Sequence, residues 1–157
     1  MRTPTPFGMR NETMPARIVA VCVSRNKGER KTPVDAVELR VNHGIVGDAH
    51  AGEWHRQISL LGQESIDKMR RLGLAVDAGD FAENITTRGI DLPALPVGKK
   101  VSVGEALIEI TQIGKECHSR CVIYHQAGDC VMPKEGVFAR VLHGGVVRPE
   151  DAVKVLR

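Results

Sequence analysis

The feature that most constrains the fold is a series of short apolar runs, rich in β-branched residues and separated by glycine turns. Such runs predict strands, and the Gly104-Glu105 turn between residues 99–103 and 106–112 predicts a hairpin. Aromatic residues make up only 3% of the chain, so Val, Ile and Leu must form the core of any sheet. Further strands are predicted within 16–24, 36–52, 56–65, 81–90 and 146–156.

One segment has a helical pattern instead. Residues 65–73 carry apolar side chains at Ile66, Met69 and Leu72, and Gly73 is a suitable residue to end the helix. Residues 24–35 are expected to form a charged loop, and residues 135–145 form either a short helix or a strand. Strands and helices do not alternate regularly, which disfavours a doubly wound sheet. We therefore predict a mainly β fold, a closed or nearly closed β-barrel with one or two short helices.

The length of 157 residues fits one domain, which we place at 14–157 after a disordered tail at 1–13. The net charge of +3 suits a small ligand that bears a phosphate. No basic stripe is interleaved with aromatic residues, so no nucleic-acid partner is expected. No apolar run approaches the roughly 18 residues that span a membrane, and the N-terminus has no apolar signal-peptide region. A cytoplasmic location is the expectation.

Three of the four cysteines lie in KECHSRCVIYHQAGDC, residues 115–130. In the reducing cytoplasm, clustered thiols indicate metal-binding, catalytic or redox chemistry rather than disulfides. The spacing of Cys117, Cys121 and Cys130 is neither a zinc knuckle nor an iron–sulfur pattern, although a structural zinc site remains an alternative. Cys130, and above all Cys22 within its predicted strand, can instead be small buried residues of the core.

Cys117 is the best candidate for a reactive or metal-ligating thiol. It follows a predicted strand and lies beside Lys115 and His118, and nearby cations favour the thiolate. Cys121 is the second candidate.

Two other segments supply polar groups that can surround a ligand. In NHGIVGDAHAGEWHRQ, residues 42–57, glycines such as Gly47 allow close backbone approach, and Asp48, His50 and Arg56 add charge and proton chemistry. Arg56 is a natural partner for a phosphate or carboxylate. Glu83 and Asn84, in the predicted strand at 81–90, either brace this loop or contact the ligand.

These segments together resemble the MOSC domain, the module at the C-terminus of molybdenum cofactor sulfurases. The resemblance rests on GIVGDAHAG with RQISLL, FAENITT, LPVGKKVSVGEALIEITQIGKEC and GVFARVLHGG, in this order. It implies a β-rich barrel, an association with the molybdenum cofactor (molybdopterin), and a cysteine that carries sulfur or ligates molybdenum. Cys117 matches that cysteine by its place after ITQIGKE. The SRC at 119–121 is similar to the Cys-Ser-Arg-Cys of amidoxime-reducing relatives, which favours Cys121.

The resemblance implies a cofactor-binding set of Gly47, Asp48, His50, Arg56, Glu83, Asn84, Lys115 and His118, with Cys117 as the metal ligand. It also implies a sulfur source, either a cysteine desulfurase or a protein of molybdenum-cofactor biosynthesis. No pyridoxal-phosphate domain is recognisable, so no pyridoxal phosphate is expected in this chain. The first alternative is a small molybdenum-dependent reductase of N-oxygenated compounds, in which a homodimer would help to bury the cofactor. The second is the structural zinc module.

Overall fold

The computed structural model describes residues 15–114 and 135–157. The predicted tail at 1–13 and the cysteine segment from Lys115 to Cys130 lie outside these residues. The elements, in chain order, are β1 (Arg17–Val23), β2 (Thr32–Val34), β3 (Val37–Arg40), β4 (Gly44–Ile45), β5 (Ile58–Gly62), α1 (Gln63–Arg71), β6 (Ile85–Arg88), a 3-10 turn η1 (Leu92–Ala94), β7 (Lys100–Val103), β8 (Ala106–Ile113), β9 (Val137–His143), β10 (Gly145–Val147) and β11 (Val153–Val155).

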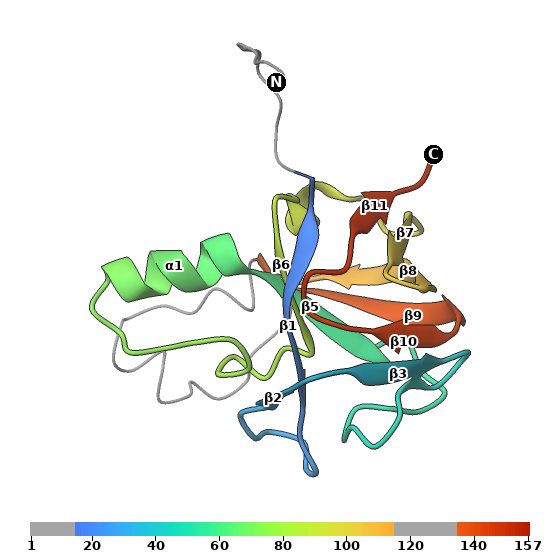
Figure 1. The fold of residues 1–157 in the computed structure, drawn as a ribbon, viewed down its shortest axis with the longest axis horizontal. Helices are drawn as coiled ribbons and strands as arrows, with labels where there is room; N and C mark the ends of the chain where they lie inside the picture. The colour runs from blue at the N-terminus through green and yellow to red at the C-terminus, as the bar shows by residue number, and fades with distance from the viewer. Residues whose placement is uncertain (1–14, 115–134) are drawn as a thin grey trace, which may run out of the picture.

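The described strands form two sheets (Figure 1). The larger has eight strands in the order β11-β7-β8-β9-β5-β6-β1-β2, and the smaller has the order β10-β3-β4. Strand β5 pairs with β6 in parallel, whereas every other strand pair between named elements is antiparallel. The hairpin predicted around Gly104 is confirmed, because Val103 of β7 pairs with Ala106 of β8.

The mainly β class is confirmed, but the predicted closed or nearly closed barrel is not. Across the described residues, the larger sheet ends at β11 on one side and at β2 on the other. One isolated bridge, between Arg17 and Ala152, connects β1 with the residue directly before β11. Strand β11 pairs with β7. Its Val153 N–H also donates to the Ala16 carbonyl, just before β1, but this bond belongs to no ladder that would close the sheet.

Several predicted boundaries also differ. Strand β5 ends at Gly62 and α1 begins at Gln63, so the strand is shorter and the helix starts two residues earlier than predicted. Within 135–145, residues 137–143 form strand β9. The expected final strand is divided into β10 and β11, and the loop at 24–35 contains β2. Only Ile85–Arg88 of the strand predicted at 81–90 is regular. In the residues before it, the Asn84 side chain accepts the Ser59 N–H and the Phe81 N–H donates to the Glu83 side chain, so these residues do not continue the strand.

The predicted helix is confirmed, but it spans 63–71 rather than 65–73, and Leu72 of the predicted apolar face is exposed. Ile66 and Met69 are buried, and basic residues occupy the last turn, where they favour the negative end of the helix dipole. The chain leaves the helix through Gly73, which has φ +96° and whose N–H donates to the carbonyl of Arg70 at 2.9 Å. No helix among the described residues is long and apolar enough to cross a membrane.

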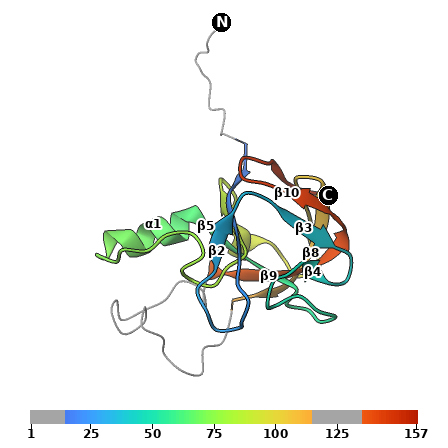
Figure 2. The ribbon, with the colours of Figure 1, turned by 60° about the horizontal axis from the view of Figure 1, so that its bottom comes forward.

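Apolar side chains gather in two clusters that use opposite faces of the central strands. Ile58 and Leu60 of β5 belong to the larger cluster, which is formed mostly by strand residues of both sheets. Leu61 belongs to a second cluster with Ile66 and Met69 of α1. Helix α1 continues directly from the end of β5 (Figure 2) and packs against Leu61. All five residues of β5 are buried. Cys22 is fully buried, as expected, and burial raises its pKa to about 12.

Candidate functional site

The glycine-containing segment after β4 folds into a tight turn that buries Asp48. Gly47 has φ +86°, a left-handed conformation that residues with a Cβ rarely adopt, and it lets the Asp48 N–H reach the carbonyl of Ile45 at 3.1 Å. The carboxylate of Asp48 then points inward. One oxygen accepts the N–H of Ser24 at 3.0 Å, and the other accepts the N–H of His50 at 3.0 Å.

Lys31 supplies the countercharge to Asp48. Its Nζ lies 2.9 Å from Asp48 Oδ1, and both side chains are fully shielded from solvent. Burial alone would raise the pKa of Asp48, but the hydrogen bonds from Lys31 and from the backbone of His50 and Ser24 outweigh it and hold that pKa below its ordinary value. The Asp48 carboxylate is therefore ionised at neutral pH, and its bonds to Lys31, Ser24 and His50 hold the turn in place.

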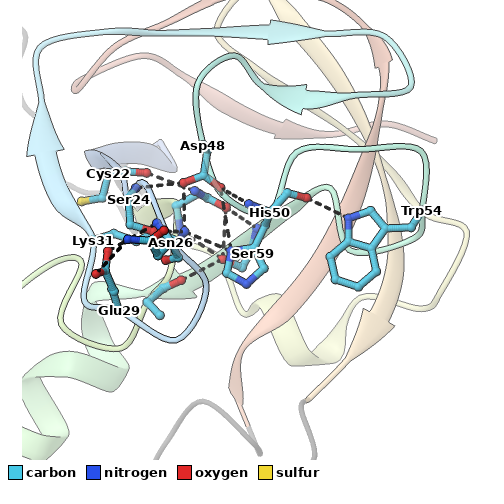
Figure 3. Close-up of polar contacts among 11 residues, drawn as sticks. Cys22, Ser24, Asn26, Glu29, Lys31, Asp48, His50, Trp54 and Ser59 are labelled. Carbon is cyan, nitrogen blue, oxygen red and sulfur yellow. Dashed lines mark hydrogen bonds and ion pairs between the residues drawn. The ribbon is translucent and has the colours of Figure 1, made fainter.

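The same ammonium group also contacts a histidine. Lys31 Nζ lies 3.0 Å from His50 Nδ1 and 3.0 Å from Ser24 Oγ (Figure 3). His50 is half-buried and lies between Lys31 and Trp54 in this view. The Trp54 indole N–H donates to the His50 carbonyl at 2.7 Å, and the two rings are parallel, with centroids 6.4 Å apart. Lys27 lies over the Trp54 ring, 4.7 Å from its centroid.

The predicted residues Glu83 and Asn84 are fully buried. Glu83 accepts hydrogen bonds from Gly79 N, Phe81 N and the Thr86 hydroxyl, and burial raises its pKa. Asn84 accepts from Ser59 N and donates to the carbonyl of Cys22, so it ties β5 to β1. The structure shows both residues in bracing contacts, and their role in cofactor binding stays a prediction.

Arg56 belongs to a separate cluster where β8 ends. Its Nε donates to Gln112 Oε1 at 3.0 Å, and its guanidinium lies over the Phe138 ring, 5.0 Å from the centroid. Its two terminal nitrogens make no hydrogen bond with any described residue. The same Gln112 oxygen lies 2.9 Å from His55 Nε2. The cluster presents a fixed cation with unused donors, as a phosphate or carboxylate would require.

This Arg56 cluster adjoins Gly114, the residue directly before the cysteine segment, and through it Gly136. Gln112 Nε2 donates to the Gly114 carbonyl at 2.9 Å, and the Gly114 N–H donates to the Gly136 carbonyl at 2.7 Å. Lys115, Cys117, His118 and Cys121 follow Gly114 but lie outside the described residues. Within 15–114 and 135–157, no group of three or more His, Cys, Asp and Glu side chains is placed to hold a metal ion.

The sequence pattern did not reveal three residues of this region. Lys31 was expected in an exposed charged loop, because lysines are rarely buried. Its three acceptors come from positions 24, 48 and 50, a proximity that only the folded chain creates. Trp54 is the only tryptophan, a signal that would have been available. Gln112 lies at the end of a predicted strand, where nothing in the sequence distinguishes it.

The fold is similar to that of several solved structures. The YuaD protein from Bacillus subtilis matches with a TM-score of 0.75 and 18% identity, over 90% of this chain and 96% of that one. YiiM from Geobacillus stearothermophilus matches with a TM-score of 0.67 and 23% identity, over 91% of this chain and 76% of that one. YiiM from Escherichia coli matches with a TM-score of 0.65 and 20% identity, over 92% and 70%. These likenesses show the fold alone.

No curated protein matches the sequence. The sequence model of the MOSC domain matches residues 47–154, a range that begins in the Gly47–Asp48 turn and ends within β11. This range covers more than half of the chain and includes Arg56, Gln112 and the whole cysteine segment. The chain therefore belongs to the MOSC domain family, which is associated with the molybdenum cofactor.

Proposed function

We propose that this chain binds the molybdenum cofactor, or carries sulfur for its maturation, at the Arg56 cluster and the cysteine segment that starts beside it. The observation that carries the proposal is the hydrogen-bonded path from Arg56 through Gln112 to Gly114. Consecutive Cα atoms are about 3.8 Å apart, so the Cα of Cys117, three residues further on, stays within about 11 Å of that of Gly114. This limit on the distance supports a site in which the thiol and the Arg56 cation bind the same ligand.

The described residues fit the cofactor at its phosphate end. Arg56 is held by Gln112 and Phe138, so little side-chain freedom is lost when its terminal nitrogens bind an anion. Soft thiolate ligands suit molybdenum, and Cys117, or Cys121 as the second candidate, would supply one. When bound, the cofactor contributes the redox and sulfur-ligand chemistry of its metal. The protein's part is to bind, orient and shield it.

The sulfur-carrier form of the proposal uses the same thiol. The thiolate of Cys117 attacks the outer sulfur of a donor persulfide, a new sulfur–sulfur bond forms, and the donor leaves as a thiolate. This exchange needs no further oxidant or reductant. The expected donor is a cysteine desulfurase, with which the chain would associate transiently. An acceptor thiolate then attacks the outer sulfur of the Cys117 persulfide, and Cys117 leaves as a thiolate.

The test is elemental analysis combined with intact mass on protein from cells that make the cofactor. Wild type is compared with Cys117→Ser and Cys121→Ser. We expect molybdenum, or one extra sulfur mass, to be lost in Cys117→Ser and kept in Cys121→Ser. Loss in Cys121→Ser alone would transfer the role to that residue. Stoichiometric zinc that is lost in both variants, without molybdenum, would contradict the proposal and support the structural zinc module.

Arg56 is tested in the same preparations. Arg56→Gln removes the cation, and we expect about tenfold less molybdenum per chain, the loss typical of one hydrogen bond to a charged group. Arg40→Gln is the matched control, because Arg40 is exposed on β3 and pairs only with Glu38 among the described residues. Turnover of an N-oxygenated compound with an electron donor would favour the reductase alternative over the carrier.

A further inference from the structure

We propose that Gln112 is a positioning residue whose uncharged amide holds Arg56 in place without neutralising it. The Gln112 oxygen sets the direction of the guanidinium, and because the amide is uncharged, the positive charge of Arg56 stays available to an oxyanion. The bonds of Gln112 follow from the described residues alone, whereas the identity of the oxyanion, a phosphate, rests on the proposed function.

An irregularity in β8 turns Gln112 toward Arg56. Ile110 pairs with Ala139 of β9, and both belong to the larger apolar cluster. Gln112 pairs with the neighbouring Phe138, which belongs to the second cluster on the other face. In a regular strand Ile110 and Gln112 would face the same side of the sheet, so one extra residue forms a β-bulge between them. The bulge places Gln112 on the face where Arg56 lies over the Phe138 ring.

The amide of Gln112 can lie only one way round. Arg56 Nε always carries a proton, so the Gln112 atom that lies 3.0 Å from it must be the oxygen. The Gly114 carbonyl can only accept, so the Gln112 atom that lies 2.9 Å from it must be the nitrogen. A half-turn of the amide would place two donors together at one end and two acceptors together at the other. The amide is therefore held at both ends.

The same amide oxygen also fixes His55. The Nε2 atom of His55 lies 2.9 Å from Gln112 Oε1. Because an amide oxygen cannot donate, His55 must carry a proton on Nε2. Two N–H groups from consecutive residues thus converge on one uncharged acceptor. No carboxylate within 15–114 and 135–157 pairs with the Arg56 guanidinium, so its charge is not cancelled by any of these residues.

The lack of charge on Gln112 separates a positioning role from a purely structural one. A carboxylate at this position could accept from the same two N–H groups, and it would bind the arginine more strongly through a charge-assisted hydrogen bond. It would also cancel the charge that attracts an anion. A residue that only stabilised the fold could therefore be acidic, whereas a residue that presents Arg56 to an anion must be neutral.

The test is titration calorimetry with inorganic phosphate, in which Gln112→Glu is compared with wild type. We expect Gln112→Glu to stay folded and to bind phosphate about tenfold more weakly, the loss typical of one hydrogen bond to a charged group. Equal affinity in Gln112→Glu and wild type, or no binding by wild type, would overturn the proposal.

Asn42→Asp is the matched control for the added charge. It also changes an amide to a carboxylate, and its oxygen can still accept from Gln57, but it has no bond to Arg56. Its phosphate affinity should equal that of wild type. An equal loss in Asn42→Asp and Gln112→Glu would show that any added negative charge weakens binding, and it would overturn the specific role of Gln112.

A second measurement needs no variant of Gln112. Long-range proton–nitrogen correlation NMR on ¹⁵N-labelled wild type locates the proton of His55, whose signals are assigned by their absence in His55→Gln. We expect a proton on Nε2. A ring that is protonated on Nδ1 alone would overturn the proposal whether or not Gln112→Glu folds, because the Gln112 oxygen would then face no donor from His55.

Molybdenum content separates this inference from the proposed function. In protein from cells that make the cofactor, we expect about tenfold less molybdenum per chain in Gln112→Glu than in wild type or Asn42→Asp. Wild type without molybdenum or added sulfur would overturn the proposed function, even where phosphate binding depends on Gln112. Wild type with molybdenum, together with full phosphate affinity in Gln112→Glu, would overturn the positioning role alone.

Discussion

Lys31 and Asp48 form a buried ion pair, and its contribution to stability depends on whether every donor and acceptor of the two groups has a hydrogen-bond partner. Removing two charges from water is costly, and the cost is offset only where every proton and lone pair finds a partner. Here Lys31 has three acceptors, and both Asp48 oxygens accept backbone N–H groups. The arrangement is therefore sensitive to loss of one partner, which leaves the other charge buried alone.

Lys31→Met should lower the free energy of unfolding by about 3–5 kcal/mol, because Asp48 keeps its charge without a counterion. Urea denaturation measures this difference. The double variant Lys31→Met with Asp48→Asn should cost less than Lys31→Met alone, and exposed Lys27→Met should change stability by less than about 0.5 kcal/mol. Equal losses in the single and double variants would show that the pair is not coupled.

The pH dependence of stability should carry the signature of Asp48. Its folded pKa lies below the unfolded value, so its contribution is present above about pH 4 and is lost as the pH falls through the folded pKa. Unfolding measured from neutral pH into the acid range should show this loss in wild type. The acid slope should be shallower in Asp48→Asn, and an identical slope in the two proteins would contradict the assignment.

Glu83 should behave with the opposite sign. Burial raises its folded pKa, so its ionisation lowers stability as the pH rises from the unfolded value, about 4.3, through the folded pKa. Glu83→Gln removes this pH-dependent term, but its amide nitrogen cannot accept a backbone N–H. We expect a net loss of about 1–3 kcal/mol at neutral pH. Denaturation of both proteins across pH 4–8 measures the two effects together.

At the scale of elements, the loop between α1 and β6 packs directly on the buried lysine. The carbonyl of Gly79 accepts the Lys31 N–H at 2.7 Å, and its N–H donates to Glu83. Gly79 has φ +90°, and a Cβ on it would lie 2.1 Å from the Lys31 carbonyl oxygen. This loop therefore needs glycine for both its conformation and its close contact with the chain before β2.

A pair of alanine substitutions separates these two requirements. Gly79→Ala should cost several kcal/mol, because it adds a backbone clash to the roughly 1–2 kcal/mol of a left-handed alanine. Gly73→Ala is the control: φ is +96° and no atom lies within 4 Å of its added Cβ, so only the conformational cost applies. Thermal or urea unfolding gives both values, and similar losses would argue against the clash.

The local sequence pattern predicted the strands and the helix better than it predicted which strands pair with each other. The β-branched runs specified β1, β5 and β8, and the spacing of Ile66 and Met69 specified α1. The parallel pairing of β5 with β6, and the place of β9 between β8 and β5, depend on contacts between distant segments that no local pattern encodes. The predicted strand boundaries were wrong where the side chain of a polar residue such as Asn84 binds the backbone of neighbouring strands instead of extending a strand.

For the molecule as a whole, Gln57 joins the two sheets. Its side-chain oxygen accepts the Val141 N–H of β9 at 2.9 Å, and its amide donates to Asn42 Oδ1, in the turn between β3 and β4, at 3.1 Å. The residue is fully buried. Nothing in the local pattern singles out Gln57, because its partners Asn42 and Val141 lie 15 and 84 residues away along the chain.

Gln57→Leu should lower the free energy of unfolding by about 1–3 kcal/mol, because the Val141 N–H stays buried without an acceptor. The loss should be uneven across the fold. Native-state hydrogen exchange should show a larger fall in protection for the β3–β10 amides than for those of α1, which Gln57 does not contact. A uniform fall would indicate that the two sheets unfold only together.

The hydrogen bond between Gly114 and Gly136 has a consequence for how members of such a fold diversify. The paired strands β8 and β9 already bring these two residues together, so their positions are set by the sheet and not by the stretch that joins them. The entropy of closing a loop grows only with the logarithm of its length, about 0.6 kcal/mol for each doubling. Insertions, deletions and new thiol spacings between Gly114 and Gly136 therefore cost little folding free energy, and the chemistry of this stretch can change while β8 and β9 stay the same.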